Sequence, residues 1–323
     1  MRAPDFWKRD GGTLAPWLLG PLEGVTARLT ASRLSRPGWR APVPVLCCGN
    51  AGVGGAGKTT VALDLGRRLV ARGLAVHFLT RGYGGRLPDA TRVDPERHGA
   101  AEAGDEALLL TRVAPTWIAA DRAAGARAAV AAGAAALVMD DGLQNPALVK
   151  DVSLLVIDGS AGFGNGRLLP AGPLREPVAA AAARSSAAVL IGEDRCQAQA
   201  LLPSALEVLR ARLAPASNGS ALAGQRVLAF AGIGNPDKFW STVAKTGAVL
   251  VGSARFADHH FYREAELRRL AAQAERLDAA LVTTAKDAVR LPPAWREAVH
   301  VLGARLVWED AARLESLLAG WAG

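Results

Sequence analysis

Short apolar runs alternate along the chain with stretches whose apolar residues recur every three or four positions. The apolar runs predict strands at Val43–Cys48, Ala75–Thr80, Thr116–Ala119, Ala135–Met139, Val152–Ile157 and Ala187–Ile191. The helical spacing predicts helices at Lys58–Arg72, Asp105–Val113 and Asp121–Ala132. Because uninterrupted apolar strands alternate with helices, we predict an α/β fold with a mostly parallel, doubly wound sheet covered on both faces.

A second alternating set follows a stretch of Pro, Ser, Asn and Gly residues at 214–224, which predicts a linker. Its strands and helices are expected at Arg226–Ala231, Pro236–Thr246, Ala248–Val251, Arg263–Arg276 and Ala279–Thr284. We therefore predict three parts of the chain. These are an N-terminal segment over 1–40, a large α/β domain over 41–218 and a smaller C-terminal α/β domain over 219–323.

The first forty residues have a distinct pattern. Apolar residues fall at helical spacing from Leu14 to Leu29, although Pro16 and Pro21 are expected to start or break helices there. The segment also carries several tryptophans, seven cations and three acids. A basic, apolar, tryptophan-containing helix is typical of a segment at a membrane surface. An amphipathic helix packed on the domain explains the same pattern, and the sequence leaves both interpretations open.

Composition narrows the class of protein. Three cysteines in 323 residues exclude a disulfide scaffold, and half the residues are apolar, which is enough for a large core. The net charge is +8, but the arginines are dispersed and aromatics make up 5%, so we do not expect a nucleic-acid partner. An anionic membrane surface or a phosphorylated substrate accounts for the excess of positive charge.

The sequence also bears on location. Apolar runs are too short to cross a bilayer and no signal peptide is evident, so we expect a cytosolic or membrane-surface location.

The segment GVGGAGKT at 52–59 fits the pattern GxxxxGK[ST], follows a predicted strand and opens a predicted helix. Glycines let backbone N–H groups surround phosphate oxygens, Lys58 reaches the β- and γ-phosphates, and Thr59 offers a hydroxyl to Mg²⁺. The motif therefore predicts that the chain is a P-loop NTPase. The predicted nucleotide-binding residues are Gly52, Val53, Gly54, Gly55, Ala56, Gly57, Lys58, Thr59 and Thr60.

A second pattern, AALVMDD at 135–141, places Asp140 and Asp141 at the end of an apolar strand. Neighbouring residues of an extended chain point to opposite sides, so one carboxylate is expected to hold Mg²⁺ and the other to brace a loop. The sequence does not favour one over the other. A guanine-specific NKxD motif is absent, which favours ATP over GTP. These patterns predict Mg·ATP binding and leave the acceptor open.

Eight segments together resemble the tetraacyldisaccharide 4′-kinase family of lipid A biosynthesis, from the N-terminus to about residue 291. They are GNAGVGGAGKTT (49–60), TRGYGG (80–85), GDEALLL (104–110), DDGLQN (140–145), GNGRLLPAGPLRE (164–176), AGIGNPDKFW (231–240), FADHHFY (256–262) and TTAKDAVRL (283–291). The resemblance implies an ATP-dependent kinase at the cytoplasmic face of a Gram-negative inner membrane. Its acceptor would be the 4′-hydroxyl of an acylated glucosamine disaccharide 1-phosphate, and its product lipid IVA. Thr60 and Asn145 depart from the proline and histidine usual at those positions.

The resemblance implies that Asp105 is the catalytic base and that His259 is its partner, with Lys58 acting on the transferred phosphate. The residues alone allow Asp105 to be a helix cap and do not separate His259 from His260. Glu176 is a further predicted metal ligand beside Thr59, Asp140 and Asp141. The predicted substrate or phosphate contacts are Arg81, Glu106, Gln144 and Arg175. Lys286 and Asp287 are expected to form a structural ion pair with each other.

A switch ATPase of the partition or metallochaperone type, acting on a protein partner, is the alternative function. Those loops carry a second lysine before the paired glycines, where this chain has Val53. A peripheral membrane-binding module with vestigial nucleotide binding is a weaker alternative, because the Lys58–Thr59 and Asp140–Asp141 pairs are both complete.

Overall fold

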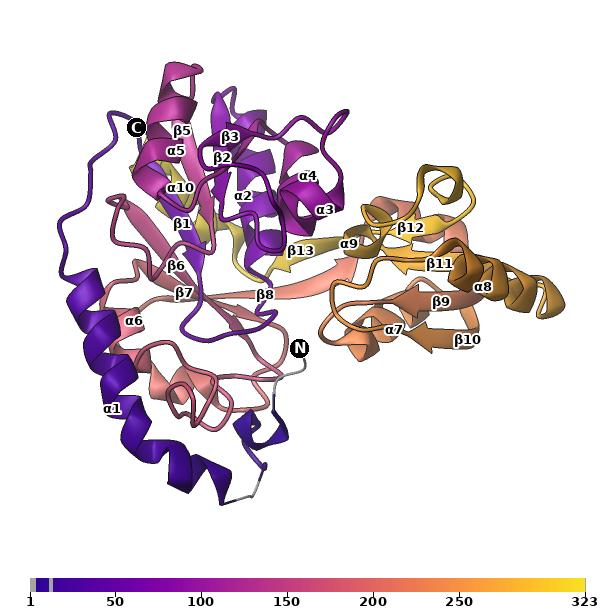
Figure 1. The fold of residues 1–323 in the computed structure, drawn as a ribbon, viewed down its shortest axis with the longest axis horizontal. Coiled ribbons are helices and arrows are strands. Elements are labelled where there is room, and N and C mark those ends of the chain that lie inside the picture. The colour runs from indigo at the N-terminus through magenta and orange to yellow at the C-terminus, as the bar shows by residue number, and fades with distance from the viewer. Residues whose placement is uncertain (1–3, 12–13, 323) are drawn as a thin grey trace.

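The computed structural model describes residues 4–11 and 14–322, and its main feature is a pair of β-sheets (Figure 1). Within these residues, nine strands form the large sheet, all parallel except at its two edges. In spatial order they are β13 (Ala304–Trp308), β8 (Val208–Pro215), β7 (Ala187–Ile191), β6 (Val152–Asp158), β1 (Val45–Gly49), β5 (Ala136–Asp140), β2 (Val76–Thr80), β4 (Thr116–Ile118) and β3 (Thr91–Arg92). The predicted α/β class and mostly parallel sheet are confirmed.

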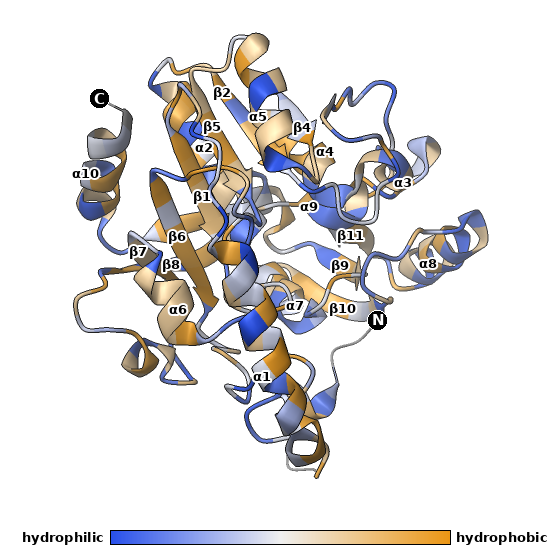
Figure 2. Cartoon of the chain, turned by 60° about the vertical axis from the view of Figure 1, so that its left-hand side comes forward, coloured by the Kyte–Doolittle hydropathy of each residue, from blue (hydrophilic) through white to orange (hydrophobic). Residues whose placement is uncertain are grey.

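Helices cover both faces of the large sheet. They are α2 (Lys58–Ala71), α3 (Ala100–Ala103), α4 (Asp105–Thr111), α5 (Arg122–Ala131), α6 (Val178–Ala183) and α10 (Ala311–Ala322). Leu46 and Cys48 of β1 belong to the same core cluster as Leu65 of α2, whereas Cys47 packs in the cluster that contains Ala126 of α5. Because both faces are buried, the strands are continuously apolar, as Figure 2 shows for the central strands.

The small sheet is built from four parallel strands of the described chain, in the order β10 (Val249–Arg255), β9 (Arg226–Ala231), β11 (Ala280–Thr284) and β12 (His300–Leu302). Three helices accompany it, α7 (Pro236–Ala244), α8 (Glu264–Arg276) and α9 (Ala285–Ala288). Short 3₁₀ turns complete the chain at Asp5–Trp7, Ala198–Leu201, Ser217–Leu222 and Pro293–Trp295. We call the two sheets with their helices the large body and the small body.

Two antiparallel strands join the bodies. β8 leads out of the large sheet toward the small body, and β13 returns beside it with Ala304 opposite Pro215 (Figure 1). The chain then ends in α10, whose Leu314 and Leu318 are buried in the large core. Within the stretch 219–323 of the expected smaller domain, the last strand thus pairs with the large sheet and the last helix packs on it. Sequence order does not reveal such a return, since nothing local tells β13 which sheet it joins.

The predicted linker at 214–224 lies between the bodies but is structured. β8 continues to Pro215, and a 3₁₀ turn over Ser217–Leu222 follows, in which Leu222 is buried in the small body. The boundaries 1–40, 41–218 and 219–323 remain predictions, and some positions of the first segment lie outside the described residues.

Helix α1 (Ala15–Leu34) runs along the outside of the large body (Figure 2). Pro16 lies in the first turn, as expected, but the helix continues through Pro21 instead of breaking there. An internal proline removes one backbone hydrogen bond, and contacts beyond it hold the helix. Glu23 Oε2 accepts a hydrogen bond from the N–H of Leu168, and Thr30 Oγ1 donates one to the carbonyl of Arg175.

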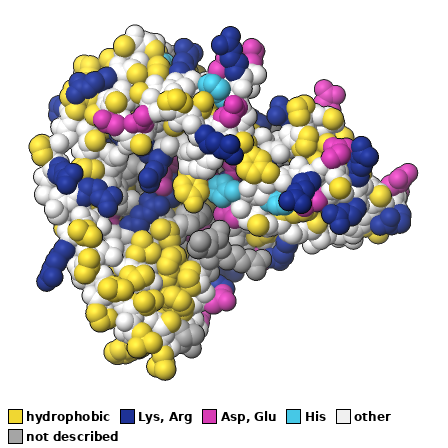
Figure 3. All heavy atoms as spheres, in the orientation of Figure 1, with side chains coloured by type: hydrophobic (Ala, Val, Ile, Leu, Met, Phe, Trp, Pro, Cys, Tyr) yellow, Lys and Arg dark blue, Asp and Glu magenta, His cyan; other side chains and the backbone are white. Residues whose placement is uncertain are grey.

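The side of α1 that faces away from these contacts is apolar and exposed. Its exposed large residues are Leu14, Trp17, Leu18, Leu22, Val25 and Leu29. Figure 3 shows hydrophobic side chains gathered around the lower part of the molecule where α1 runs. None of the helices in the described ranges combines the length and apolar character needed to cross a bilayer.

We expect Leu318→Ala in α10 to lower the free energy of unfolding by about 2–5 kcal/mol, because it opens a cavity in the core of the large sheet. Urea denaturation followed by tryptophan fluorescence measures this loss. Ser316→Ala, on the exposed side of the same helix, is the control and is expected to change stability by less than about 0.5 kcal/mol. Equal effects of the two substitutions would show that α10 does not belong to this core.

Candidate active site

The P-loop connects β1 to α2, as the motif predicts. Gly54 and Gly57 have φ angles of +118° and +90°, in the left-handed region that glycine adopts without strain. Lys58 opens α2, and its Nζ donates to Oδ1 of Asn50 at 3.0 Å. The loop is also held from outside, because the N–H of Val53 donates to the carbonyl of Pro173 at 2.8 Å. The predicted loop residues therefore form one turn at the carboxyl end of β1.

Asp140 lies at the end of β5 against the first turn of α2. Thr59 Oγ1 donates to its Oδ2 at 2.7 Å, while Oδ1 is buried and has no hydrogen-bond partner in the described chain. Burial raises the pKa of Asp140 to about 7, which the Thr59 hydrogen bond only partly opposes. An enclosed carboxylate oxygen without a partner, beside a hydroxyl, fits a hard cation such as Mg²⁺.

Asp141 points elsewhere, as expected for the second of two adjacent residues. It has φ +57°, and its Oδ1 lies 3.6 Å from Nζ of Lys58 and 3.3 Å from Nη1 of Arg175. Burial raises its pKa, but these two cations outweigh the burial and lower the pKa below its usual value. The two acids therefore occupy opposite electrostatic environments at the end of one strand.

Gln144, Arg175 and Glu176 join the same cluster. Gln144 Nε2 donates to the carbonyl of Asn50 at 2.7 Å and to Oε1 of Glu176 at 2.8 Å. The Oε1 atom of Gln144 accepts a hydrogen bond from Arg175. The second oxygen of Glu176 pairs with Arg184. Both oxygens of this buried carboxylate thus have partners, in contrast to Asp140. The structure brings Glu176 to the predicted metal region, and its role as a ligand stays a prediction.

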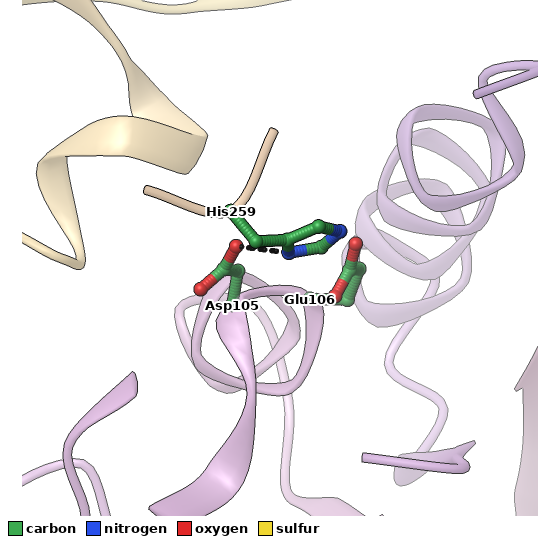
Figure 4. Close-up of side chains that lie close together, drawn as sticks. All are labelled: Asp105, Glu106 and His259. Carbon is green, nitrogen blue, oxygen red and sulfur yellow. Dashed lines mark hydrogen bonds and ion pairs between the residues drawn. The ribbon is translucent and has the colours of Figure 1, made fainter. Parts of the chain in front are cut away.

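Asp105 and His259 meet across the two bodies. His259 Nδ1 and Asp105 Oδ2 are 2.8 Å apart, and Asp105 is 3% exposed (Figure 4). Gly104, not Asp105, is the N-cap of α4, and no side-chain cap bond forms there, so the alternative role of Asp105 as a cap is not realised. His260 turns to Glu266 within the small body. The geometry thereby separates the two adjacent histidines.

Asp105, Glu106 and His259 each offer a ligand atom within 4.8 Å of the others (Figure 4). Two cations already occupy this cluster, since Lys286 Nζ lies 2.8 Å from Glu106 and Arg290 Nε lies 3.4 Å from Asp105. These charges repel a metal ion, so we do not assign a metal here. The expected pairing of Lys286 with Asp287 is wrong, because Lys286 pairs with Glu106 and Asp287 pairs with Arg290.

Sequence reasoning missed four side chains of the site, namely Asn50, Arg122, Lys286 and Arg290. Arg122 is buried in the first turn of α5, and burial lowers its pKa although Asp141 opposes this. A positive charge is unfavourable at the N-terminus of a helix, so the position of Arg122 in the sequence could have indicated a role outside its own helix. The predicted contact Arg81 follows β2, is exposed, and lies close enough to Arg122 to affect its pKa.

A family model for tetraacyldisaccharide-1-P 4′-kinases matches residues 15–322. The tetraacyldisaccharide 4′-kinase of Gluconacetobacter diazotrophicus is 59% identical over 321 residues, covering 99% of this chain and 98% of that protein. The enzyme of the same name from Rhodospirillum centenum is 55% identical, covering 99% and 96%. The crystal structure of LpxK from Aquifex aeolicus in complex with ATP has a TM-score of 0.77 at 23% identity, covering 95% of this chain and 99% of that one.

The Asp140 carboxyl keeps its proton in the folded chain up to about pH 7, against 3.8 for the ordinary group. A pKa raised by folding makes stability fall as pH rises between these values, so ionised Asp140 destabilises the metal-free protein above pH 7. We expect Asp140→Asn to raise Tm in EDTA, by an amount that grows from pH 5 to pH 8. At about 1.4 kcal/mol per pKa unit, the corresponding gain in the free energy of unfolding is of the order of a few kcal/mol.

Asp141→Asn is the matched control, with the opposite sign. The lowered pKa of Asp141 means that its charge stabilises the fold above its ordinary pKa, so removing it should lower Tm at pH 8. Thermal unfolding of both variants across this pH range makes the comparison. Shifts of the same sign, or a gain for Asp140→Asn that does not depend on pH, would contradict the assigned environments.

Proposed function

The chain belongs to the family of tetraacyldisaccharide-1-P 4′-kinases, and we propose from its site how it carries out that reaction. The protein is an ATP-dependent kinase that transfers a phosphoryl group to the 4′-hydroxyl of tetraacyldisaccharide 1-phosphate, a lipid A precursor, to give lipid IVA. The alternative of a switch ATPase acting on a protein partner is not favoured by the relatives at 55% and 59% identity.

ATP is assigned to the P-loop. The glycines at 54 and 55 have open space where a side chain would project, which leaves room for phosphate oxygens to approach the backbone. Lys58 is held at the start of α2 by Asn50 and placed to reach the phosphates. Thr59 and Asp140 would hold Mg²⁺, which when bound offsets the negative charge of the phosphates. Asp141 and Arg175 neutralise each other and border the same space.

Asp105 is assigned as the general base. Its Oδ2 is bound by His259, whereas no group of the described chain hydrogen-bonds to its Oδ1, so this oxygen is available to the acceptor hydroxyl. The observation that carries the assignment is the 2.8 Å contact between Asp105 and His259, because it joins residues 154 positions apart, one from each body. The Glu106 carboxylate next to it is near enough to Asp140 to raise that group's pKa, so base and metal region are neighbours.

The acyl chains of the substrate and the bilayer are assigned to α1. Trp17 and Leu18 are nearly four-fifths exposed, and Arg28, Arg33 and Arg36 follow on the exposed surface of the helix or just beyond it. Apolar and aromatic side chains beside arginines suit the interface of an anionic membrane. We assign the protein to the cytoplasmic face of the bacterial inner membrane as a peripheral protein, where ATP and a membrane-embedded acceptor are both accessible.

The kinase assignment is tested by transfer of labelled γ-phosphate from Mg·ATP to tetraacyldisaccharide 1-phosphate in mixed micelles. We expect Asp105→Asn to lower kcat by about 10²–10⁴-fold, the usual contribution of a general base. His259→Gln should lower it by about tenfold or more. His260→Gln is the matched control, since His260 bonds Glu266 and not Asp105, and should keep kcat within about twofold.

Wild-type turnover in Asp105→Asn would refute the assignment of the base. Failure of the wild-type protein to phosphorylate the lipid, with ATP hydrolysis intact and nucleotide-dependent dimers in solution, would instead restore the switch-ATPase alternative.

Membrane binding is tested by co-sedimentation with vesicles containing anionic phospholipid. We expect Trp17→Ser combined with Leu18→Ser to weaken partitioning by about tenfold or more, because each apolar side chain contributes about 1.5–3 kcal/mol when fully buried. Val249→Ser combined with Leu250→Ser removes two exposed apolar residues of β10 in the small body, far from α1 (Figure 1), and should leave binding unchanged. Equal losses in the two double variants would contradict a specific role for α1.

A further inference from the structure

Two cations of the small body reach the adjacent acids of α4 in the large body. Lys286 of α9 places its Nζ 2.8 Å from Oε1 of Glu106, and Arg290 places its Nε 3.4 Å from Oδ2 of Asp105. Neither cation contacts the P-loop within the described part of the chain. Their position suggests that they act on the acid pair and not on the nucleotide.

Arg290 is completely enclosed, and each end of its guanidinium group is fixed. Nη2 donates to Oδ1 of Asp287 at 2.8 Å and to the carbonyl of Gly232, and Nη1 donates to the carbonyl of His260. The N–H of His259 in turn donates to the same Gly232 carbonyl. One guanidinium therefore holds both the loop that presents His259 and the carboxylate that His259 meets.

Asp287 anchors this guanidinium from the other side. Its Oδ1 accepts from the hydroxyl of Tyr262 at 2.6 Å and from the N–H of Gly232 at 2.8 Å, and its Oδ2 accepts from Thr284. A buried ion pair is tolerated when further hydrogen bonds occupy the remaining donors and acceptors of both partners, as they do for Arg290 and Asp287. Such a network fixes Arg290 in one position, so its distance to Asp105 depends on how the small body docks.

Lys286 determines which nitrogen of His259 carries the proton. Its ammonium group can only donate hydrogen bonds, and its Nζ lies 3.4 Å from Nε2 of His259. Lys286 is nearer to Nε2 than the Asp258 carboxylate, whose Oδ2 lies at 3.8 Å, so Nε2 is assigned as the acceptor. The proton is then on Nδ1, the atom 2.8 Å from Oδ2 of Asp105. In this tautomer His259 donates to Asp105 and does not itself compete for the proton of the acceptor.

We propose that Lys286 and Arg290 are positioning residues that assemble the Asp105–His259 pair when the small body docks on the large one. Arg290 and His259 hold Oδ2 of Asp105, and Lys286 holds Glu106 and the far nitrogen of His259. This arrangement leaves Oδ1 of Asp105 for the acceptor hydroxyl. This inference rests on the proposed function, because it assigns Asp105 as the base of the kinase reaction.

The kinetic test centres on Lys286, whose side chain is a quarter exposed, so that its replacement does not open the buried network. We expect Lys286→Met to lower kcat by about tenfold or more and to leave KM for ATP within about twofold, because misplaced catalytic groups lose rate without loss of nucleotide contacts. Lys286→Arg retains a donor and should recover most of the rate. Arg290→Lys keeps a charge beside Asp287 but cannot keep every hydrogen bond of the guanidinium, so it should lower both kcat and Tm.

A double-mutant cycle separates positioning from general stability. If Lys286 acts through Asp105, then adding Lys286→Met to Asp105→Asn should lower kcat by less than about twofold further. Lys238→Met is the matched control, because Lys238 also joins the small body to an acid of the large body, Asp158, away from the base. It should keep kcat within about twofold.

The tautomer is read independently of lipid phosphorylation, from ¹⁵N chemical shifts of the histidine rings. We expect the proton on Nδ1 of His259 in the wild-type protein and a change of tautomer or ring charge in Lys286→Met. A proton on Nε2 in the wild type, or losses of kcat that multiply in the double variant, would overturn the proposal. Absence of lipid phosphorylation with the expected shifts would overturn the kinase function and leave the assembled Asp105–His259 pair in place.

Discussion

The site depends on one constraint of parallel sheets, which is that all their strands end at the same edge. In this protein there are two such sheets, and contacts of Asp105 with His259 and of Glu106 with Lys286 join their carboxyl edges. Polar groups follow the strand ends on both sides, namely Asn50 after β1, Arg81 after β2, Arg122 after β4, Asp141 after β5, Gly232 after β9 and Lys286 after β11. Because each group leaves a rigid strand, the chemistry is set by how the two edges meet and not by any single loop.

The candidate site residues whose place in the fold follows from the sequence belong to local patterns. The P-loop and the acids after β5 belong to short motifs in which spacing determines geometry, so their placement could be foreseen. Asp105 and His259 are 154 residues apart, and a family resemblance paired them where the residues alone did not. Arg290 has no distinguishing pattern in the sequence. Its importance arises from the complete burial of its side chain and from partners on other elements, which no local pattern encodes. The same applies to β13, whose partner strand lies about ninety positions earlier.

Helix α1 and the nucleotide site share one piece of chain. The segment 163–176 accepts and donates hydrogen bonds with Glu23 and Thr30 of α1, and its Pro173 carbonyl holds the P-loop at Val53. The same segment ends in Arg175 and Glu176, which border the acids after β5. The exposed apolar helix and the phosphate-binding turn therefore rest on opposite sides of a single loop. Helix α1 and the phosphate site are therefore linked by hydrogen bonds through this loop.

The antiparallel pair β8 and β13 gives the chain the topology of an insertion. Since Ala304 and Pro215 lie directly opposite each other, a short hairpin turn between them would complete the large sheet without residues 216–303. The inserted segment carries His259 and Arg290, whereas Asp105 stays with Lys58, Thr59 and Asp140 in the remainder. The assigned base and the nucleotide site thus belong to one part of the fold, and the groups that position the base belong to the other. These positioning groups enter the fold as one continuous cassette at the position of a single hairpin.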